Sequence, residues 1–335
     1  MPGKSHICLT HGRYIVPSNT STTNAQNQNA VLKLAGARKR KYSYYLMIVL
    51  FLLPASLFYG TFNVYGTVMT FYYSLLKWSG IGTNIQFVGF GNFQKLLQDP
   101  MLWHSLSNNI IVIVTSIAVQ LPLGLLLALI INLKITGAKF FRTVYFMPML
   151  LSTVAIGILW SLMYDPNFGM LNSLLDAIGL GRFKSGWLGD EKTALLAILI
   201  TICWQFTPLY MILMKAGLTN IPEELYESAY LDGATKFQAF WGITLPLMSS
   251  TIKTASILSL VGSLKYFDLI YIMSGGGPNG ASELMATYMY KKGFVEFDMG
   301  YGSSIAAFMF IVALTLATTV QYFQRRGNSE RGMQA

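Results

Sequence analysis

Six long hydrophobic stretches, separated by polar segments, dominate the pattern of this chain. Each reaches or approaches the roughly 20 residues that a helix needs to cross the hydrocarbon core of a bilayer. They occupy residues 44–76, 107–133, 140–163, 193–213, 249–273 and 303–322. We therefore predict an all-α membrane protein with six transmembrane helices. An even number of crossings would place both termini on the same side of the membrane.

Composition supports the assignment to a membrane. Of 335 residues, 53% are hydrophobic and only 11% are charged, whereas charged residues make up about a quarter of a typical soluble domain. The net charge of +10 is compatible with nucleic-acid binding, but basic residues in a membrane chain more often report orientation. We expect membrane lipid around the chain and no nucleic-acid partner.

The distribution of Lys and Arg predicts which side each loop faces. With the amino terminus inside, the cytoplasmic segments carry sixteen of these residues and the outer segments carry seven. Because cytoplasmic loops are enriched in Lys and Arg, we expect a multi-pass protein with both termini in the cytoplasm. Residues 1–42 would form a disordered basic tail, since they hold too little apolar surface to fold. Residues 43–326 would form the six-span domain and residues 327–335 a carboxy-terminal tail.

The loop between the fourth and fifth stretches holds the densest acidic cluster of the chain. Pro222 followed by Glu223 and Glu224 is typical of a helix start, because proline lacks the donor that a first turn leaves unpaired and carboxylates suit its positive end. We predict a short helix from there to about Leu231. On the orientation above, this loop is cytoplasmic.

A bend and a second short helix are expected next. Asp232-Gly233 supplies residues that tolerate a turn. Helical composition resumes from Ala234 to Gly242, and Leu245-Pro246 is expected to interrupt it again.

The spacing of residues in this loop resembles that of a known family. Glu227-Ser228-Ala229, Gly233 four residues later, and then Ile243-Thr244-Leu245-Pro246 look like the EAA loop of bacterial ABC importer permeases, with Ser228 in place of an alanine. The surrounding sequence is similar to the carbohydrate-uptake subfamily, on the side of the maltose-type and glycerol-phosphate-type first permease subunit. A plainer reading is an amphipathic helix at the membrane surface with solvated acids.

The resemblance implies the type I ABC importer permease fold and a cytoplasmic coupling loop at residues 216–249, seated in a groove of an ATPase. It also implies a second homologous permease subunit, two ATPase subunits that bind ATP and Mg, and an extracytoplasmic solute-binding protein. The solute would be a sugar, an oligosaccharide or a related polyol. The residues assigned to ATPase coupling are Glu223, Glu224, Glu227, Ser228, Ala229, Asp232, Gly233, Ile243, Leu245 and Pro246.

No catalytic or metal-binding motif stands out in the sequence. It lacks the G-x-x-x-x-G-K-[ST] phosphate loop, so energy would come from another subunit. We expect a non-enzymatic chain that holds no cofactor and no metal. Two alternatives remain, a membrane-embedded lipid-modifying enzyme and a passive channel. The enzyme would need acidic metal-binding clusters or a nucleophile at the membrane edge.

Several polar and aromatic residues within the stretches are candidates for contact with a saccharide, because sugars bind to aromatic faces and to side-chain donors and acceptors. Each is also explained by packing within the bundle. Lys265 and Asp268 are three residues apart, so they are expected to share a helical face and to pair. The candidates for the substrate path are Asn109, Gln120, Trp204, Gln205, Tyr210, Lys265 and Tyr266.

The outer loops are predicted to be ordered. Apolar residues recur at helical spacing in LNSLLDAIGL, from Leu171 to Leu180. DPNFGMLN and SGGGPNGAS resemble outer-loop signatures of the same permease family, which implies that they help to dock the binding protein. Capping of the bundle explains these loops equally well.

Overall fold

A computed structural model of the chain describes the backbone of residues 44–132 and 138–332. The chain divides into two compact units, one ending at Thr67 and the other beginning at Val68, and each is described by itself. The tail predicted at residues 1–42 lies outside the described residues, as do residues 333–335.

The six predicted stretches correspond to four unbroken helices and two bent pairs of helices. The unbroken helices are Tyr44–Ser74, Pro100–Asn132, Ala194–Thr219 and Met299–Tyr322. The bent pairs are Thr143–Leu150 with Thr153–Met163, at 104°, and Lys236–Leu247 with Ser249–Leu264, at 63°. With each bent pair counted as one span, the described residues supply up to six spans, so the predicted number is confirmed and the third and fifth spans are broken.

The helix Tyr44–Ser74 runs through Pro54 without interruption. It contains a π-helical turn, η1 (Gly60–Val64), and its last part is α2 (Tyr65–Ser74). A short antiparallel pair of strands follows in the second unit, β1 (Leu76–Lys77) and β2 (Gln86–Phe87).

The second span begins at a well-capped helix end. The carboxylate of Asp99 accepts the N–H of Met101, and Pro100 occupies the first helical position, where its missing donor costs nothing. This span consists of α4 (Pro100–Thr115), a π-helical turn η2 (Ser116–Gln120) and α5 (Leu121–Asn132).

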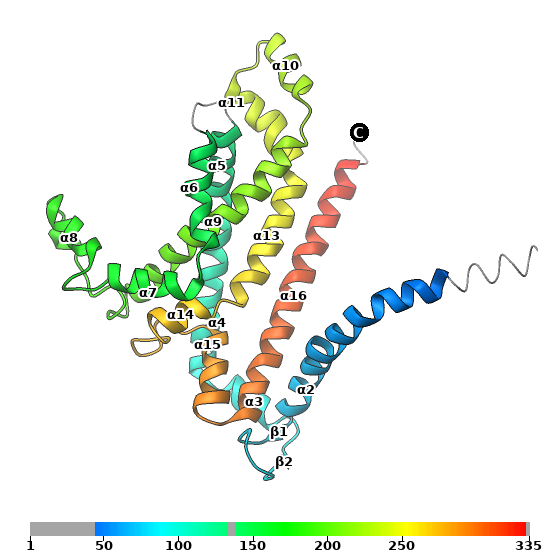
Figure 1. Cartoon of the computed structure of the whole chain (residues 1–335), viewed down its shortest axis with the longest axis vertical. Coiled ribbons are helices and arrows are strands. Elements are labelled where there is room, and N and C mark those ends of the chain that lie inside the picture. Colours follow the sequence, from blue (N-terminus) through cyan, green and yellow to red (C-terminus); the bar gives the residue numbers. More distant parts are fainter. Residues whose placement is uncertain (1–43, 133–137, 333–335) are drawn as a thin grey trace, which may run out of the picture. The chain divides into compact units, whose positions relative to one another are not determined.

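The fourth span, α9 (Ala194–Thr219), packs against α5 at very short range (Figure 1). A Cβ placed on Gly124 would lie 2.8 Å from the Cβ of Tyr210 and 3.0 Å from the backbone N of Met211. Only glycine allows the two backbones to come this close. Helix α9 continues through Pro208 to Thr219.

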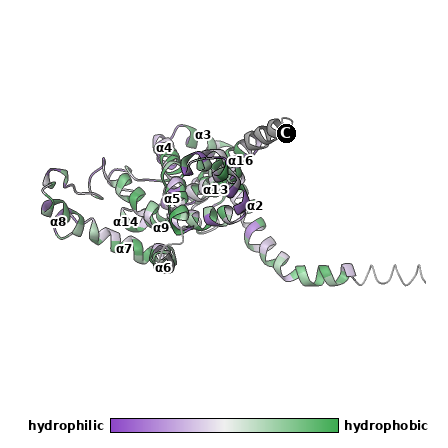
Figure 2. Cartoon of the chain, turned by 90° about the horizontal axis from the view of Figure 1, so that it is seen from above, coloured by the Kyte–Doolittle hydropathy of each residue, from purple (hydrophilic) through white to green (hydrophobic). Residues whose placement is uncertain are grey.

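The third span is not the single helix predicted over residues 140–163. Helix α6 (Ala138–Leu150) ends two residues after Pro148, and α7 (Thr153–Met163) begins beyond Ser152, whose extended backbone makes the turn. Helix α8 (Met170–Ala177) follows, which confirms the helical spacing seen in LNSLLDAIGL, and a short turn η3 (Gly181–Phe183) leads to α9. Helices α7 and α14 carry mostly hydrophobic residues (Figure 2).

The fifth predicted stretch, residues 249–273, contains a second break beyond the bend at Met248. Helix α13 (Ser249–Leu264) ends before Lys265, and α14 (Asp268–Met273) starts three residues later. Lys265 and Asp268 therefore do not share a helical face, and the described residues include no ion pair between them. The predicted pair is wrong because the helix ends between its two members.

The sixth span is preceded by α15 (Met285–Tyr290) and a π-helical turn η5 (Lys291–Val295). Its helix α16 (Met299–Gly332) extends beyond both predicted ends, 303 and 322. At the same end of the bundle lies the short helix α3 (Gly91–Leu97).

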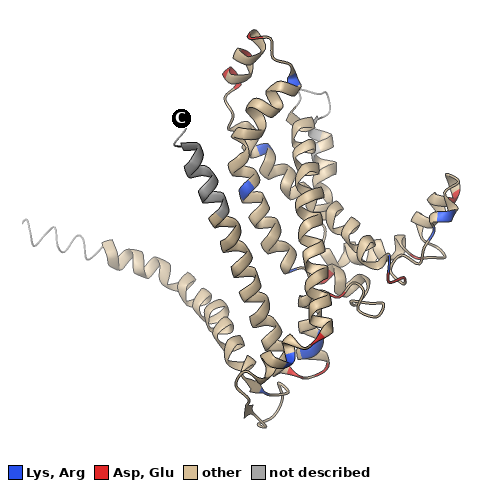
Figure 3. Cartoon of the chain, turned by 180° about the vertical axis from the view of Figure 1, so that it is seen from behind, with Lys and Arg blue, Asp and Glu red and all other residues tan. Residues whose placement is uncertain are grey.

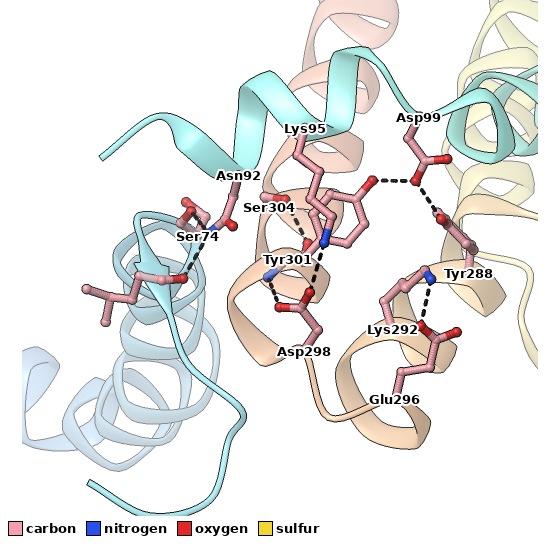
Figure 4. A network of polar contacts seen from close by, with 11 residues as sticks. Ser74, Asn92, Lys95, Asp99, Tyr288, Lys292, Glu296, Asp298, Tyr301 and Ser304 are labelled. Carbon is pink, nitrogen blue, oxygen red and sulfur yellow. Dashed lines mark hydrogen bonds and ion pairs between the residues drawn. The ribbon is translucent and has the colours of Figure 1, made fainter. Parts of the chain in front are cut away.

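A polar network, which we call the α3 clasp, ties α3 and the start of α4 to α15 and α16 (Figure 4). Lys95 forms an ion pair with Asp298 at 3.0 Å. The hydroxyl groups of Tyr288 and Tyr301 both donate to Oδ2 of Asp99, each at 2.5 Å. Burial opposes ionisation of Asp99, but the hydrogen bonds from these two hydroxyls and from the N–H groups of Met101 and Leu102 together hold the pKa of the carboxyl below its usual value.

We predict that the close approach of α5 to α9 makes Gly124→Ala destabilising by about 1–3 kcal/mol, because the added methyl group overpacks the contact. Gly262→Ala is the matched control, since a Cβ on Gly262 in α13 would meet nothing within 4 Å. Thermal unfolding of the detergent-solubilised protein measures both. Equal midpoints for the two variants would contradict the packing described here.

We predict that Asp99→Asn lowers the free energy of unfolding by about 1–3 kcal/mol, because a carboxylate accepts two hydroxyl donors better than an amide does. Asp298→Asn removes the charge from an exposed ion pair with Lys95 and leaves an amide oxygen that can still accept the N–H of Tyr301, so it should cost less than about 1 kcal/mol. Because the native pKa of Asp99 lies below that of a free aspartate, its contribution to stability is fully present above the pKa of the unfolded chain and is lost as the pH falls through the native pKa. The unfolding midpoint as a function of pH checks this, and a larger loss for Asp298→Asn would count against it.

Candidate functional site

The first candidate site is a bent pair of short helices that we call the elbow, residues 222–244. Helix α10 (Glu223–Leu231) begins directly after Pro222 and carries Glu223 and Glu224 in its first turn. Both predicted ends of this helix are confirmed. In Figure 3 the ribbon of α10 is marked with acidic residues in red, at the end of the bundle opposite α3.

The bend of the elbow depends on Gly233. The N–H of Ala234 donates to the carbonyl of Ala229 at 2.9 Å, and the N–H of Gly233 donates to that of Tyr230 at 3.1 Å. This is the Schellman arrangement, which places the residue after the helix cap in the left-handed region. Gly233 has φ +83°, which glycine adopts at no steric cost.

The second half of the elbow resumes as a helix. In α11 (Lys236–Ala239), Thr235 and Gln238 cap each other reciprocally, a capping box that fixes the new helix start. The helix continues through η4 (Phe240–Thr244) and α12 (Leu245–Leu247) and ends at Met248. The interruption predicted at Leu245-Pro246 comes two residues later, at Met248, where the chain bends by 63° before Ser249, because proline is tolerated in the first turn of α12.

The two halves of the elbow are joined to each other and stand over a pocket. The hydroxyl of Tyr226 lies 2.8 Å from Oγ1 of Thr244. A pocket of about 750 Å³ lies beneath α10, between it and the ends of α5 and α9, and Glu223, Glu227 and Tyr230 line it.

The surface of the elbow combines acids with exposed apolar side chains. No residue of α10 is buried, and Leu231 is 89% exposed, while Phe237 and Trp241 are also exposed. Apolar patches of this kind typically mark surfaces that bind another protein. Of the residues predicted for coupling, Ala229, Ile243 and Leu245 are half-buried, and those exposed are Glu223, Glu224, Glu227, Ser228, Asp232, Gly233 and Pro246.

The second candidate site is a group of side chains inside the bundle that we call the polar cluster, comprising Gln120, Cys203, Tyr210, Ser259 and Tyr266. Gln120 faces Cys203 and Tyr266, and Tyr210 faces Ser259. Gln120 is fully buried, yet neither of its amide atoms makes a hydrogen bond of standard geometry with the described residues, and the same holds for Oγ of Ser259. Unpaired polar atoms are costly in a bundle core, and Gln120 ends a π-helical turn, a feature frequent at functional sites.

Other predicted substrate-path residues lie elsewhere. Asn109 is fully buried, and its amide accepts the N–H of Met285 at 2.9 Å and donates to the carbonyl of Ser263 at 3.3 Å. Both amide atoms of Asn109 are therefore hydrogen-bonded to the backbone, where they fix the start of α15. Nε2 of Gln205 donates to Oγ1 of Thr153 at 3.2 Å.

Trp204 and Lys265 are also placed apart from the polar cluster. The rings of Trp204 and Trp160 meet edge to face. Trp204 also lines an apolar pocket of about 570 Å³ between α5, α6 and α9. Lys265 is exposed at the end of α13. The structure therefore brings together three of the seven candidates, Gln120, Tyr210 and Tyr266.

The sequence did not single out Ser259 or Cys203. A signal was present in the second half of α13, where Ser256, Ser259 and Ser263 recur at helical spacing within residues 255–264, which are otherwise apolar or glycine. Small hydroxyl residues at such spacing mark a polar seam between membrane helices. Among residues 44–132 and 138–332, no group of three or more His, Cys, Asp or Glu side chains is arranged to hold a metal ion.

Comparison with known proteins identifies the family. Residues 120–329 match the model of the binding-protein-dependent transport system inner membrane component. The chain belongs to this family. The permease is 38% identical over 280 residues to a probable ABC transporter permease protein of Pyrococcus horikoshii, covering 84% of this chain and 96% of that one.

A second relative and a solved structure extend the comparison. The permease is 33% identical over 289 residues to the trehalose/maltose transport system permease protein of Thermococcus litoralis, covering 85% and 95% of the two chains. It superposes with a TM-score of 0.73, at 25% identity, on a chain of a bacterial ABC transporter involved in the import of alginate, covering 88% of this chain and 99% of that one. The predicted type I ABC importer permease fold is thereby confirmed.

Proposed function

We propose that this permease is the membrane subunit of an ATP-driven importer for a sugar, an oligosaccharide or a related polyol. The observation that carries the proposal is the elbow, an exposed acidic and apolar surface bent at Gly233 and continuous with a spanning helix. Such a surface suits a protein partner. In this account the partner is an ATPase subunit, and ATP and Mg are bound there rather than by this chain.

The orientation of the chain in the membrane is inferred from the distribution of Lys and Arg over its loops. The excess of Lys and Arg in the segments assigned to the inside, sixteen against seven, supports a cytoplasmic elbow and two cytoplasmic termini in the bacterial cytoplasmic membrane. The α3 clasp and the loop before α15 then face outward. Two ATPases, a second homologous permease and an extracytoplasmic binding protein complete the assembly. The structure of an alginate transporter in complex with a periplasmic protein bound to an alginate pentasaccharide is a precedent for such a partner in a similar fold.

The mechanism that we propose is mechanical. Closure of the ATPases on ATP moves the elbow, in which Glu224, Glu227, Ala229, Gly233 and Leu245 form the joint. Helix α9, which ends at Thr219, is followed closely by α10, which begins at Glu223, so movement of the elbow reaches the bundle through α9. The bundle and its partner permease then rock between inward-open and outward-open states.

The polar cluster supports a hydrophilic solute. Gln120 and Ser259 carry donors and acceptors that make no hydrogen bond of standard geometry within the cluster, and Tyr210 and Tyr266 offer aromatic faces with hydroxyl groups, a combination that suits sugars. The relative named for trehalose and maltose supports the same class of solute. A lipid-modifying enzyme would need a metal cluster or a nucleophile, and a passive channel would have no use for the elbow.

We predict that Gly233→Val uncouples ATP hydrolysis from uptake, because a β-branched residue resists a φ of +83°. Strain of about 1–2 kcal/mol would displace the bend and lower uptake about tenfold, with assembly and ATP hydrolysis retained. Gly233→Asn should stay close to the wild type, because asparagine tolerates this backbone region. Uptake and hydrolysis are measured together in proteoliposomes.

Gly242→Val is the matched control for that experiment. A Cβ on Gly242 would meet nothing within 4 Å, and its φ is not positive. Uptake by Gly233→Val that matches uptake by Gly242→Val would argue against a role for the bend in coupling.

We predict that Gln120→Leu and Asn109→Leu have opposite effects on stability. Removing the unpaired amide of Gln120 should leave the unfolding midpoint unchanged or higher while uptake falls about tenfold, a loss equivalent to one hydrogen bond. Asn109→Leu should lower stability by at least about 2 kcal/mol, since it leaves the N–H of Met285 unpaired. Normal uptake by Gln120→Leu would remove the polar cluster from the solute path.

A further inference from the structure

A second polar cavity lies at the end of the bundle opposite the elbow. It has a volume of about 480 Å³ and is bordered by the glycine-rich turn Gly275–Gly277, by Glu283 and by residues of α15 and η5. This volume falls in the range of about 300–1,000 Å³ that is typical of small-molecule sites. We call it the glycine-loop pocket.

Glu283 is the unusual member of this pocket. Its side chain lines the cavity while the residue is only 3% exposed, and Oε1 has no hydrogen-bond partner among the described residues. Burial raises the pKa of the carboxyl, although Thr287 and Lys291 act in the opposite direction. A buried acceptor without a donor is costly in a folded protein, which points to a ligand that supplies the donor.

The surrounding backbone is shaped to hold this carboxyl group in place. Gly276 has φ +88°, and a Cβ on it would collide with the carboxyl of Glu283. Below the turn, Nδ2 of Asn108 donates to the carbonyl of Glu283 at 2.9 Å and to that of Ala281 at 3.0 Å. The position of Glu283 is therefore fixed from both sides by α4 and by the glycine-rich turn.

The charges around the pocket favour a neutral ligand. Lys292 is paired with Glu296 at 2.6 Å, and the hydroxyl of Tyr288 is committed to Asp99. Lys291, which also lines the pocket, interacts electrostatically with Glu283. An incoming cation would meet two lysines and an anion would meet two glutamates, whereas a ligand rich in hydroxyl groups can donate to Glu283 and accept from Lys291.

We propose that the glycine-loop pocket is a saccharide subsite on the outer side of the bundle, in which Glu283 accepts hydrogen bonds from sugar hydroxyl groups. The inference rests on the proposed function and deepens it. The pocket would hold the solute after its release from the binding protein and before it reaches the polar cluster within the spans. Glu283 lies in the loop after α14 and belongs to neither of the two candidate sites described above.

The test uses the assembled complex in nanodiscs and a chemical reporter in the pocket itself. Met101 lines the pocket, so Met101→Cys introduces a thiol there, and its modification by a maleimide is followed by peptide mass spectrometry. Maltose, trehalose, cellobiose and raffinose are the probes, and uptake of each by the same complex is measured in parallel. A sugar that is imported should slow the modification of residue 101.

Two further variants are compared in the Met101→Cys background. Glu283→Gln is isosteric and should raise the half-protecting concentration of the sugar at least about tenfold, because a hydrogen bond to a charged group is lost. Glu283→Asp keeps the charge and should raise it less. Asp176→Asn removes an exposed acid that is paired with Lys184 in a different loop and should change nothing.

The outcomes separate the subsite from the transporter function. Import of a sugar that gives no protection at residue 101, or an unchanged half-protecting concentration in Glu283→Gln, overturns the subsite and leaves the proposed function standing. A complex that imports none of the four sugars overturns the proposed function for this class, and the subsite with it.

Discussion

The close packing of α5 against α9 is the contact on which the rest of this permease depends. With no Cβ at Gly124, the two helices approach until their backbones touch, and the membrane offers no hydrophobic driving force to replace such packing. Helix α9 spans 26 residues, about 39 Å at 1.5 Å per residue. One face of α9 carries Cys203 and Tyr210 of the polar cluster. The helix ends at Thr219, three residues before the elbow begins at Pro222.

The second constraint is that lipid cannot satisfy free backbone groups, so a broken helix must be covered by protein. The third span breaks before α7, and the fifth predicted stretch breaks before α14, and these two short helices pack against each other. A Cβ on Gly157 in α7 would lie 2.9 Å from Ile272 in α14. Helices α7 and α14 thus cover part of each other's surface. Tyr266 lies in the non-helical segment between α13 and α14, from which it faces Gln120.

The elbow was predictable from sequence because its rules are local. A proline with acids after it and a glycine at a bend act over four or five residues, and Pro222, Leu231 and Gly233 take the expected positions. Where the prediction failed, the deciding contact was distant in sequence. Asn109 is committed to Met285, 176 residues away, and no local pattern indicates that. The pairing of Lys265 with Asp268 failed because the helix ends between them, and the role of Ser259 appears only once α13 lies beside α9.

The central claim is that the elbow is the joint through which an ATPase drives this bundle. The most direct test is photo-crosslinking from single positions in the assembled complex, with a benzophenone maleimide attached to Ser228→Cys in α10 or to Phe90→Cys beside α3. Both positions are exposed, Phe90 at 77%. The account predicts that position 228 crosslinks to the ATPase, in a pattern that changes when ATP is added, and that position 90 does not. Crosslinking of the ATPase from position 90, or none from position 228, would contradict it.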